Sequence, residues 1–317
     1  YSFNLLSITL FLIPALIFSS KSRNFKIITI VFIFFILSLN SFYGKNRIEK
    51  LSQINKKDLS YLIKIVSPSI DIKRFFKTDN TYELINEMSS YIKPGIEKNS
   101  IYIFPEGMLP NIYSNELKLF QKEFKNLLKP DDIIIMGINS LEDYSKQENL
   151  YNSLVVLDSN LRTIEKYNKQ NLVPFGEFLP FEKLITSFGL KKVSIGYKSF
   201  SPGLEKKVIF LEKYGIRFLP TICYEIIYTG NFQKQTFNII INISEDGWFG
   251  NSIGNHQHFA HSIFRSIEQG SSVLRSANNG ISAHITPYGF IENKLESTEK
   301  GVIEINSLYP KVKTLFN

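Results

Sequence analysis

Two apolar segments at the start of the chain restrict its architecture most, because neither contains a charged residue. Residues 1–20 and 27–44 are each about as long as the ~17–25 residues that cross the hydrocarbon core of a bilayer. The connector between them, residues 21–26, reads KSRNFK and carries three positive charges. We therefore expect residues 1–44 to form two transmembrane helices joined by a short basic loop. A signal peptide is the alternative, but the second apolar run is long and no small-residue cleavage site follows it.

The basic loop also predicts an orientation. Positively charged loops stay on the cytoplasmic side of a membrane, so everything after Gly44 is expected on the external, periplasmic face. The chain has 37 Lys and Arg against 29 Asp and Glu, a net charge of +8. Outside the loop these charges are dispersed, without the basic stripe of a nucleic-acid-binding protein. We expect a membrane partner and no nucleic acid.

We interpret the polar segment 45–60 as a linker or stalk. After it, short strand-like apolar runs alternate with amphipathic helical segments. The expected strands are residues 61–66, 101–104, 132–138, 152–158, 207–212, 216–223, 237–243, 271–277, 281–287 and 302–305. The expected helices are residues 81–93, 114–128 and 255–269, the last burying Phe259, Ile263, Phe264 and Ile267. Tight turns are predicted at Tyr214-Gly215 and Asn278-Asn279-Gly280. Interleaved strands and sheet-covering helices predict an α/β domain, or a layered α-β sandwich, over residues 61–310.

Three residues, each near the end of a strand or in a loop, are candidate catalytic residues. Cys223, the only cysteine, ends the apolar run 216–223. A lone cysteine is usually an inert buried thiol, but the end of a strand is where α/β enzymes place reactive groups. Glu106 follows another strand and is either a solvated loop acid or a general base. Lys169 lies in a loop rich in apolar residues, which also contains Glu177, and an ordinary surface lysine is its simplest interpretation.

Three of the four histidines, His256, His258 and His261, lie close together in one expected helix. Such a cluster raises the alternative of a metal site. Residues two apart on a helix point to different faces, however, and no H-E-x-x-H motif supports metal binding. We therefore expect no metal ion, and the sequence gives no sign of a cofactor.

Five motifs in order are far more specific than any one of them. They are FPEG at 104–107, K-x-x-L-V-P-F-G-E at 169–177, I-C-Y-E at 222–225, N-I-S-x-D-x-W-F-G at 242–250 and R-x-x-N-N-G at 275–280. Together they resemble the apolipoprotein N-acyltransferases, bacterial membrane enzymes with a nitrilase-like (carbon–nitrogen hydrolase) domain. The resemblance covers roughly residues 60–305. It implies a nitrilase-like α-β-β-α sandwich preceded by transmembrane helices, in the bacterial inner membrane with the catalytic domain on the periplasmic face.

The resemblance also implies a catalytic triad of Glu106, Lys169 and Cys223. Its reaction would move an acyl chain from a phospholipid to Cys223 as a thioester, and from there to a lipoprotein. The acceptor would be the α-amine of an N-terminal diacylglyceryl-cysteine, and no cofactor is implied. Other residues implied at the site, as supports or as substrate-binding groups, are Glu177, Tyr224, Glu225, Phe175 and Trp248. The alternative for each of these is that it only packs against, or hydrogen-bonds to, the catalytic residues without taking part in the reaction.

Two other functions use the same sequence features. A membrane-tethered amidase could hydrolyse a small amide with the same three residues, and a binding module could retain a degenerate site. The sequence departs from the family pattern at Phe104 and Gly107, where Trp and a small hydroxyl residue are common, and at Glu245, where Asn or Asp is usual. The resemblance also implies further membrane helices beyond both ends, so we expect this sequence to be a piece of a longer protein.

Overall fold

The chain is divided into two units in the computed structural model, residues 1–55 and residues 56–317, and each is described by itself. The structure describes residues 2–19, 21–51, 53–77, 80–93, 98–144, 147–180, 199–205, 207–229 and 236–314.

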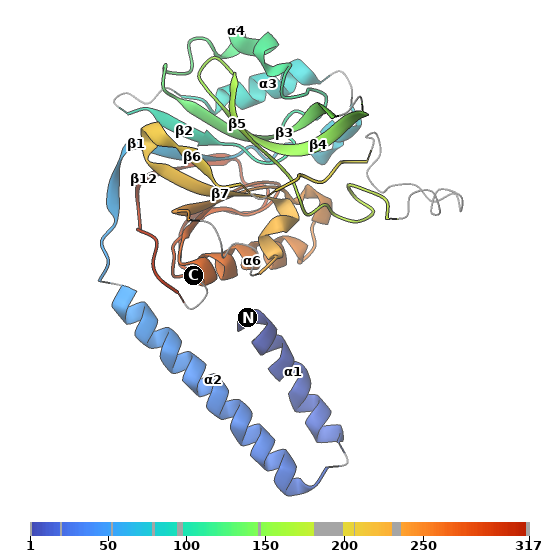
Figure 1. Ribbon diagram of the computed structural model, residues 1–317, viewed down its shortest axis with the longest axis vertical. Helices are drawn as coiled ribbons and strands as arrows, with labels where there is room; N and C mark the ends of the chain where they lie inside the picture. The colour runs from blue at the N-terminus through green and yellow to red at the C-terminus, as the bar shows by residue number, and fades with distance from the viewer. Residues whose placement is uncertain are drawn as a thin grey trace. The chain divides into compact units, whose positions relative to one another are not determined.

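The first unit is a pair of helices, α1 (Ser2–Phe18) and α2 (Arg23–Leu51) (Figure 1). By length and composition α2 can cross a membrane, and its apolar side chains are largely exposed. Helix α1 is apolar but shorter, with 17 residues. Residues 45–51, which we interpreted as part of a linker, continue α2. The expectation of two transmembrane helices stays a prediction.

The described part of the second unit contains two six-stranded mixed sheets. The first has the order β12-β1-β2-β3-β4-β5, with strands Gly301–Leu308 (β12), Lys57–Ser67 (β1), Ser100–Ile103 (β2), Ile133–Tyr144 (β3), Gln147–Leu157 (β4) and Thr163–Asn168 (β5). The second has the order β11-β10-β9-β8-β7-β6, with strands Ile291–Leu295 (β11), Ser282–Ile285 (β10), Ser272–Asn278 (β9), Ile239–Glu245 (β8), Ile216–Ile222 (β7) and Ile209–Leu211 (β6). Three neighbouring strands run parallel in each sheet, β1-β2-β3 and β7-β8-β9.

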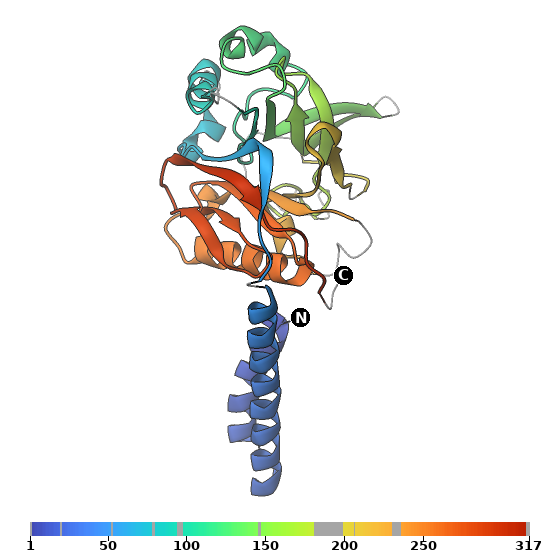
Figure 2. The same ribbon diagram turned by 90° about the vertical axis from the view of Figure 1, so that its left-hand side faces the viewer.

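Strand side chains alternate between two cores, as the two-residue period of a strand requires. In β8, Ile241 and Ile243 pack between the two sheets, while Ile240 packs on the outer face. Helices α3 (Thr81–Ser90) and α4 (Gln121–Phe124) lie over the outer face of the first sheet, and α6 (Gly254–Gln269) lies over that of the second (Figures 1 and 2). The structure is therefore the α-β-β-α sandwich that the resemblance implied.

Every strand expected from the sequence is present, and both predicted turns join antiparallel strands, β6 to β7 and β9 to β10. Two strands, β5 and β11, were not predicted. Each is the edge strand of its sheet, and their sequences TIEKYN and IENKL are largely polar. An edge strand need not bury both faces, so it lacks the apolar run that identifies a central strand.

The prediction of one helix over residues 114–128 was wrong. The segment forms a 3₁₀ turn, Leu117–Phe120, followed by the single α-turn of α4. Its apolar residues nevertheless reach the core as expected, with Leu117 and Phe124 buried. A helix this short has little stability of its own, so packing of these side chains decides its geometry.

The buried face of α6 was also predicted incorrectly in part. Phe259 is buried and Ile263 packs on the same core, but Phe264 and Ile267 are only half-buried. Polar residues take their place against the sheet, including His258 and Arg265. Apolar periodicity cannot identify such a face, because buried polar groups belong there only when a partner satisfies them.

Removing a large side chain from between the sheets should destabilise the second unit. Phe218 is fully buried there, so Phe218→Ala leaves a cavity and is expected to cost about 3–5 kcal/mol of unfolding free energy. Phe290→Ala is the control, since that ring is 53% exposed and its loss should cost within about 0.5 kcal/mol. Denaturant unfolding of the full chain in detergent measures both. Equal losses in the two variants would contradict this account of the core.

Candidate active site

The three candidate residues follow the ends of three strands. Glu106 comes three residues after β2, Lys169 immediately after β5, and Cys223 immediately after β7. Strands β2 and β5 belong to the first sheet and β7 to the second, so the site lies between the sheets. Sequence reasoning placed Lys169 in a loop and missed the strand that positions it.

Cys223 occupies a sharp turn between β7 and a 3₁₀ helix, Cys223–Ile227. Its φ of 49° lies in the left-handed region, which a non-glycine residue adopts at a cost of about 1–3 kcal/mol. Such a strand-to-helix turn projects the side chain away from the strand. Burial raises the pKa of the Cys223 thiol, and the Glu106 carboxylate raises it further, while the Lys169 ammonium opposes both. The thiol is therefore protonated at neutral pH and needs a base before it can react.

Lys169 is almost fully buried, with its ammonium between two carboxylates. Its Nζ donates to Glu177 Oε1 at 2.9 Å and to Glu106 Oε1 at 3.4 Å. Burial by itself would lower the pKa of Lys169, but the charges of Glu106, Glu177 and then Cys223 outweigh it, so the pKa is raised. Lys169 therefore stays positively charged near the thiol. A lysine with a raised pKa is not suited to act as a base.

Asn152, on β4, is a site residue that sequence reasoning missed. Its Nδ2 donates to Glu106 Oε1 at 2.7 Å and to Glu177 Oε1 at 2.8 Å, so it bridges the same two oxygens as Lys169. One signal was available, because asparagine is unfavourable in a central strand and Asn152 opens the apolar run NSLVVL. A polar side chain at such a position needs a buried partner.

Glu106 is held from its other side by the second sheet. Its Oε2 accepts the backbone N–H of Glu245, at the end of β8, at 2.9 Å. Its backbone rests on Gly137 of β3, where an added Cβ would lie 2.5 Å from the Glu106 Cα. Glycine is therefore required at 137 for Glu106 to reach this position, and Glu106 joins the two sheets at the site.

Glu245, where the sequence departs from the family pattern, forms a buried ion pair with Arg74. The Arg74 Nε also donates to the carbonyl of Gly107 at 3.0 Å. Asn278 Nδ2 donates to Glu245 Oε2 at 2.8 Å. Arg74 thereby links its segment to Gly107, which follows β2, and to Glu245 at the end of β8.

Glu225 supports the loop that carries Lys169. Its Oε1 accepts from the Tyr167 hydroxyl at 2.8 Å and from the backbone N–H groups of Gln170 and Asn171 at 2.9 and 3.1 Å. Its Oε2 accepts the N–H of Ile222 at 2.9 Å. The carboxylate therefore joins the Lys169 segment to the Cys223 turn.

The aromatic residues implied by the resemblance lie at the surface. Tyr224, Phe175 and Trp248 are 37%, 51% and 49% exposed. Trp248 contacts Phe75, with ring centroids 5.3 Å apart. Residues 181–198, which follow the loop that contains Phe175, lie outside the described residues.

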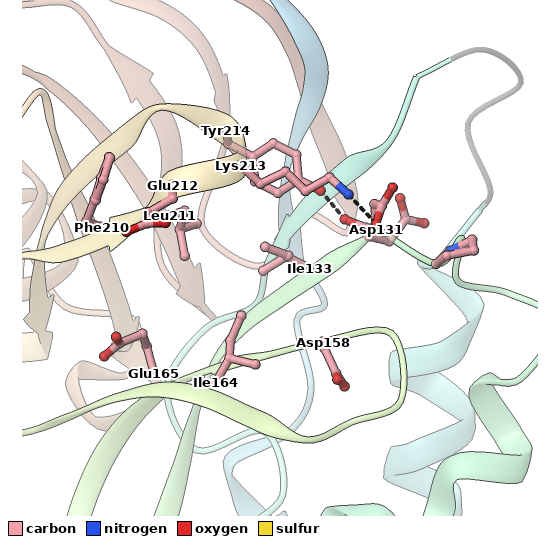
Figure 3. Close-up of a pocket in the computed structure, with 12 residues that line it drawn as sticks. Asp131, Ile133, Asp158, Ile164, Glu165, Phe210, Leu211, Glu212, Lys213 and Tyr214 are labelled. Carbon is pink, nitrogen blue, oxygen red and sulfur yellow. Dashed lines mark hydrogen bonds and ion pairs between the residues drawn. The ribbon is translucent and has the colours of Figure 1, made fainter.

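A cavity of about 330 Å³ lies away from these residues, beside the start of β3 and the β6–β7 hairpin (Figure 3). Its carboxylates include Asp131 and Glu165, which form ion pairs with Lys213 and Lys207. None of the candidate site residues lines it. Among the described residues there is also no cluster of three His, Cys, Asp or Glu side chains that could hold a metal ion.

Comparison with known proteins identifies the family. The family model for carbon–nitrogen hydrolases matches residues 74–306, more than two thirds of the chain. The chain belongs to the carbon–nitrogen hydrolase family. This family match covers the candidate residues and every strand of the two sheets except β1 and the last residues of β12.

The curated relatives that the chain resembles are apolipoprotein N-acyltransferases. The chain is 31% identical over 311 residues to an apolipoprotein N-acyltransferase of Agrobacterium fabrum, covering 96% of this chain and 58% of the relative. It is 30% identical over 294 residues to one of Rickettsia prowazekii, covering 91% and 57%. The chain therefore spans little more than half the length of these relatives. The resemblance read from the five motifs is confirmed.

Solved structures share the fold. A CN-hydrolase superfamily protein from Xanthomonas campestris, with an arsenic adduct in its active site, superposes with a TM-score of 0.54 at 13% identity, over 80% of this chain and 91% of that one. A nitrilase superfamily protein from Saccharomyces cerevisiae gives 0.55 at 17% identity, over 81% and 93%. At these identities the likeness establishes the carbon–nitrogen hydrolase fold alone.

A methyl group at residue 137 should displace Glu106. In Gly137→Ala the new Cβ meets the Glu106 backbone, which cannot rotate away, so the carboxylate moves relative to Cys223 and Lys169. We expect acylation of Cys223 by p-nitrophenyl acetate to slow about 10²-fold, as misplacement by ~1 Å typically does. Gly44→Ala is the control, because nothing lies within 4 Å of its Cβ position. An unchanged rate for Gly137→Ala would show that Glu106 tolerates the shift.

The charges around Cys223 predict opposite shifts of its titration. Glu106→Gln removes a negative charge that raises the thiol pKa, so the pH profile of alkylation should move to lower pH. Lys169→Met removes the opposing positive charge, so the profile should move to higher pH. The rate of iodoacetamide labelling, followed by mass spectrometry between about pH 6 and 11, measures both. Lys166→Met is the matched control, and shifts of the same sign in both variants would refute this electrostatic assignment.

Proposed function

We propose that this protein transfers an acyl chain from a phospholipid to the amino group of a lipoprotein's N-terminal diacylglyceryl-cysteine, with Cys223 as the nucleophile. The observation that carries the proposal is the buried Lys169 ammonium, held by two carboxylates beside the only thiol of the chain. The names of the curated relatives support N-acylation of a lipoprotein. Glu106, Lys169 and Cys223 are the proposed catalytic triad.

In the first half-reaction, Glu106 accepts the proton of the Cys223 thiol. The thiolate attacks the ester carbonyl of the phospholipid, and a C–S bond forms. The negative charge that develops on the carbonyl oxygen is stabilised by the Lys169 ammonium and the backbone N–H of Tyr224. The C–O bond of the ester then breaks, Glu106 returns the proton to the leaving oxygen, and a lysophospholipid departs. An acyl thioester remains on Cys223.

In the second half-reaction, the lipoprotein amine attacks the thioester. A C–N bond forms, Glu106 accepts the proton of the amine, and the same two donors stabilise the oxyanion. The C–S bond breaks, and Glu106 returns the proton to the Cys223 sulfur. The products are an N-acylated lipoprotein and the starting enzyme, with no cofactor consumed.

The position of Glu106 suits both transfers. Lys169 and Asn152 bind its Oε1, and the Glu245 N–H binds its Oε2. These contacts fix the position of the Glu106 carboxylate. Glu177 shares the first two donors and thereby keeps the Lys169 charge compensated when Glu106 is protonated.

Lipid substrates suit the surroundings of the site. The exposed rings of Phe175, Tyr224 and Trp248 offer apolar contacts to an acyl chain and would help to exclude the water that hydrolyses a thioester. Helix α2 is long and apolar enough to hold the enzyme in the bilayer that contains both substrates. The basic loop at residues 21–26 favours an inner-membrane enzyme whose catalytic domain faces the periplasm.

The proposal is tested by looking for the intermediate. Incubation with phosphatidylethanolamine in detergent is expected to add one acyl chain to Cys223, and mass spectrometry locates it without ambiguity because no other cysteine exists. A diacylglyceryl-cysteine peptide should then discharge the thioester as an N-acyl peptide. Cys223→Ser should stop N-acylation while leaving the fold intact.

The alternative function is an amidase that hydrolyses a small amide with the same residues. It predicts release of ammonia from water-soluble amides and no transfer from phospholipid. N-acylation retained by Cys223→Ser, or wild-type enzyme that never carries an acyl chain, would overturn the proposed mechanism.

A further inference from the structure

His258 lies behind the nucleophile, on α6, and is buried. Its Nε2 is 3.1 Å from the backbone carbonyl oxygen of Cys223. A carbonyl oxygen can only accept a hydrogen bond, so this ring nitrogen carries the hydrogen and donates it. His258 therefore binds the peptide group that joins Cys223 to Tyr224, from the side of the outer helix.

The imidazole ring is itself held in place by Asp246. Its Nδ1 is 2.9 Å from Asp246 Oδ1, which also accepts from the Ser244 hydroxyl at 2.6 Å. Arg275 Nη2 donates to the other oxygen, Oδ2, at 2.6 Å. Burial alone would raise the pKa of Asp246, but Arg275, His258 and Ser244 hold it well below the usual range. The fully buried carboxylate is thus a fixed anchor for the ring.

We propose that His258 is a positioning residue that aims the Tyr224 N–H at the oxyanion of the acyl-transfer reaction. The inference rests on the proposed function. In a planar trans peptide the C=O and N–H groups point in opposite directions, and the described residues contain no cis peptide bond. Binding the Cys223 carbonyl on the α6 side therefore turns the Tyr224 N–H away from α6, towards the space between the sheets where Lys169 and Glu106 lie.

The conformation of Cys223 explains why this peptide needs a fixed partner. With a φ of 49° the residue is strained, and relaxation to an ordinary backbone conformation would rotate its carbonyl and the following N–H together. A hydrogen bond to the carbonyl opposes that rotation. The ring has neighbours on its other sides as well, since Phe249 packs against it with ring centroids 5.5 Å apart.

A metal-binding role for His258 is incompatible with these contacts. Both ring nitrogens have partners, Cys223 O and Asp246 Oδ1, so neither offers a free lone pair to a metal ion. The histidine cluster that first suggested a metal is instead divided, with His256 exposed on the other side of the helix. His258 contacts the turn of Cys223 through the carbonyl of that residue.

Two amide substitutions separate the two contacts of the ring. In His258→Gln the side-chain amide reaches the position of Nε2 and can still donate to the Cys223 carbonyl. In His258→Asn the shorter amide takes the position of Nδ1 beside Asp246 and leaves the carbonyl without a donor. His256→Asn is the control for an asparagine on the same helix, at an exposed site.

The experiment compares two reactions of Cys223 in the full chain, acylation by phosphatidylethanolamine and alkylation by iodoacetamide. Acylation passes through an oxyanion and alkylation does not. We expect His258→Asn to lower kcat for acylation about ten- to hundredfold, with KM for the phospholipid unchanged and alkylation within about twofold of wild type. His258→Gln should retain acylation within about threefold.

Three outcomes would overturn the inference. Wild-type acylation by His258→Asn would show that the carbonyl needs no donor, and an equal loss of acylation and alkylation would show that the substitution only disturbs the turn. Equal losses in the Gln and Asn variants would remove the role of the Nε2 contact. If the wild-type enzyme alkylates but never forms an acyl-Cys223, the proposed function fails and the role of His258 with it.

Discussion

The Lys169 ammonium, buried between the carboxylates of Glu106 and Glu177, is the interaction on which the rest of the site depends. An unpaired buried charge would cost several kcal/mol, so the lysine is stable only while both carboxylates and Asn152 stay in place. The members come from different strands and loops, and the cluster forms only when these strands of the first sheet are in place. The ion pairs that compensate the buried Lys169 charge therefore also fix the position of Glu106.

The second sheet supplies the proposed nucleophile and restrains the proposed base. Cys223 follows β7, and the N–H of Glu245 at the end of β8 binds Glu106. The Glu106 backbone can lie against β3 because Gly137 has no side chain at the point of contact. Behind the nucleophile, Asp246 and His258 form a separate polar layer against α6. Because buried polar groups pack between the second sheet and α6, the apolar periodicity of α6 did not identify its buried face.

Prediction from the sequence succeeded where apolar patterns are strong. Central strands such as β8 were recognised because both faces are buried, whereas the polar edge strands β5 and β11 were missed. The missed strand β5 matters, since it places Lys169. Asn152 was overlooked for a related reason, because a single polar residue in a strand does not reveal its partner. His258 was considered only as a metal ligand, although its spacing argued against one.

The sequence by itself determined the residue types and their order, from which the α/β class, the carbon–nitrogen hydrolase family and the candidates Glu106, Lys169 and Cys223 follow. Only the tertiary structure decided that Glu106 and Glu177 share the Lys169 ammonium, and that Asn152 donates to the same two carboxylates. It also decided that His258 contacts the carbonyl of Cys223, the proposed nucleophile. The physical reason is that these contacts join segments far apart in the chain. Hydrogen bonds and ion pairs depend on distance and direction, and those exist only once the two sheets have packed together.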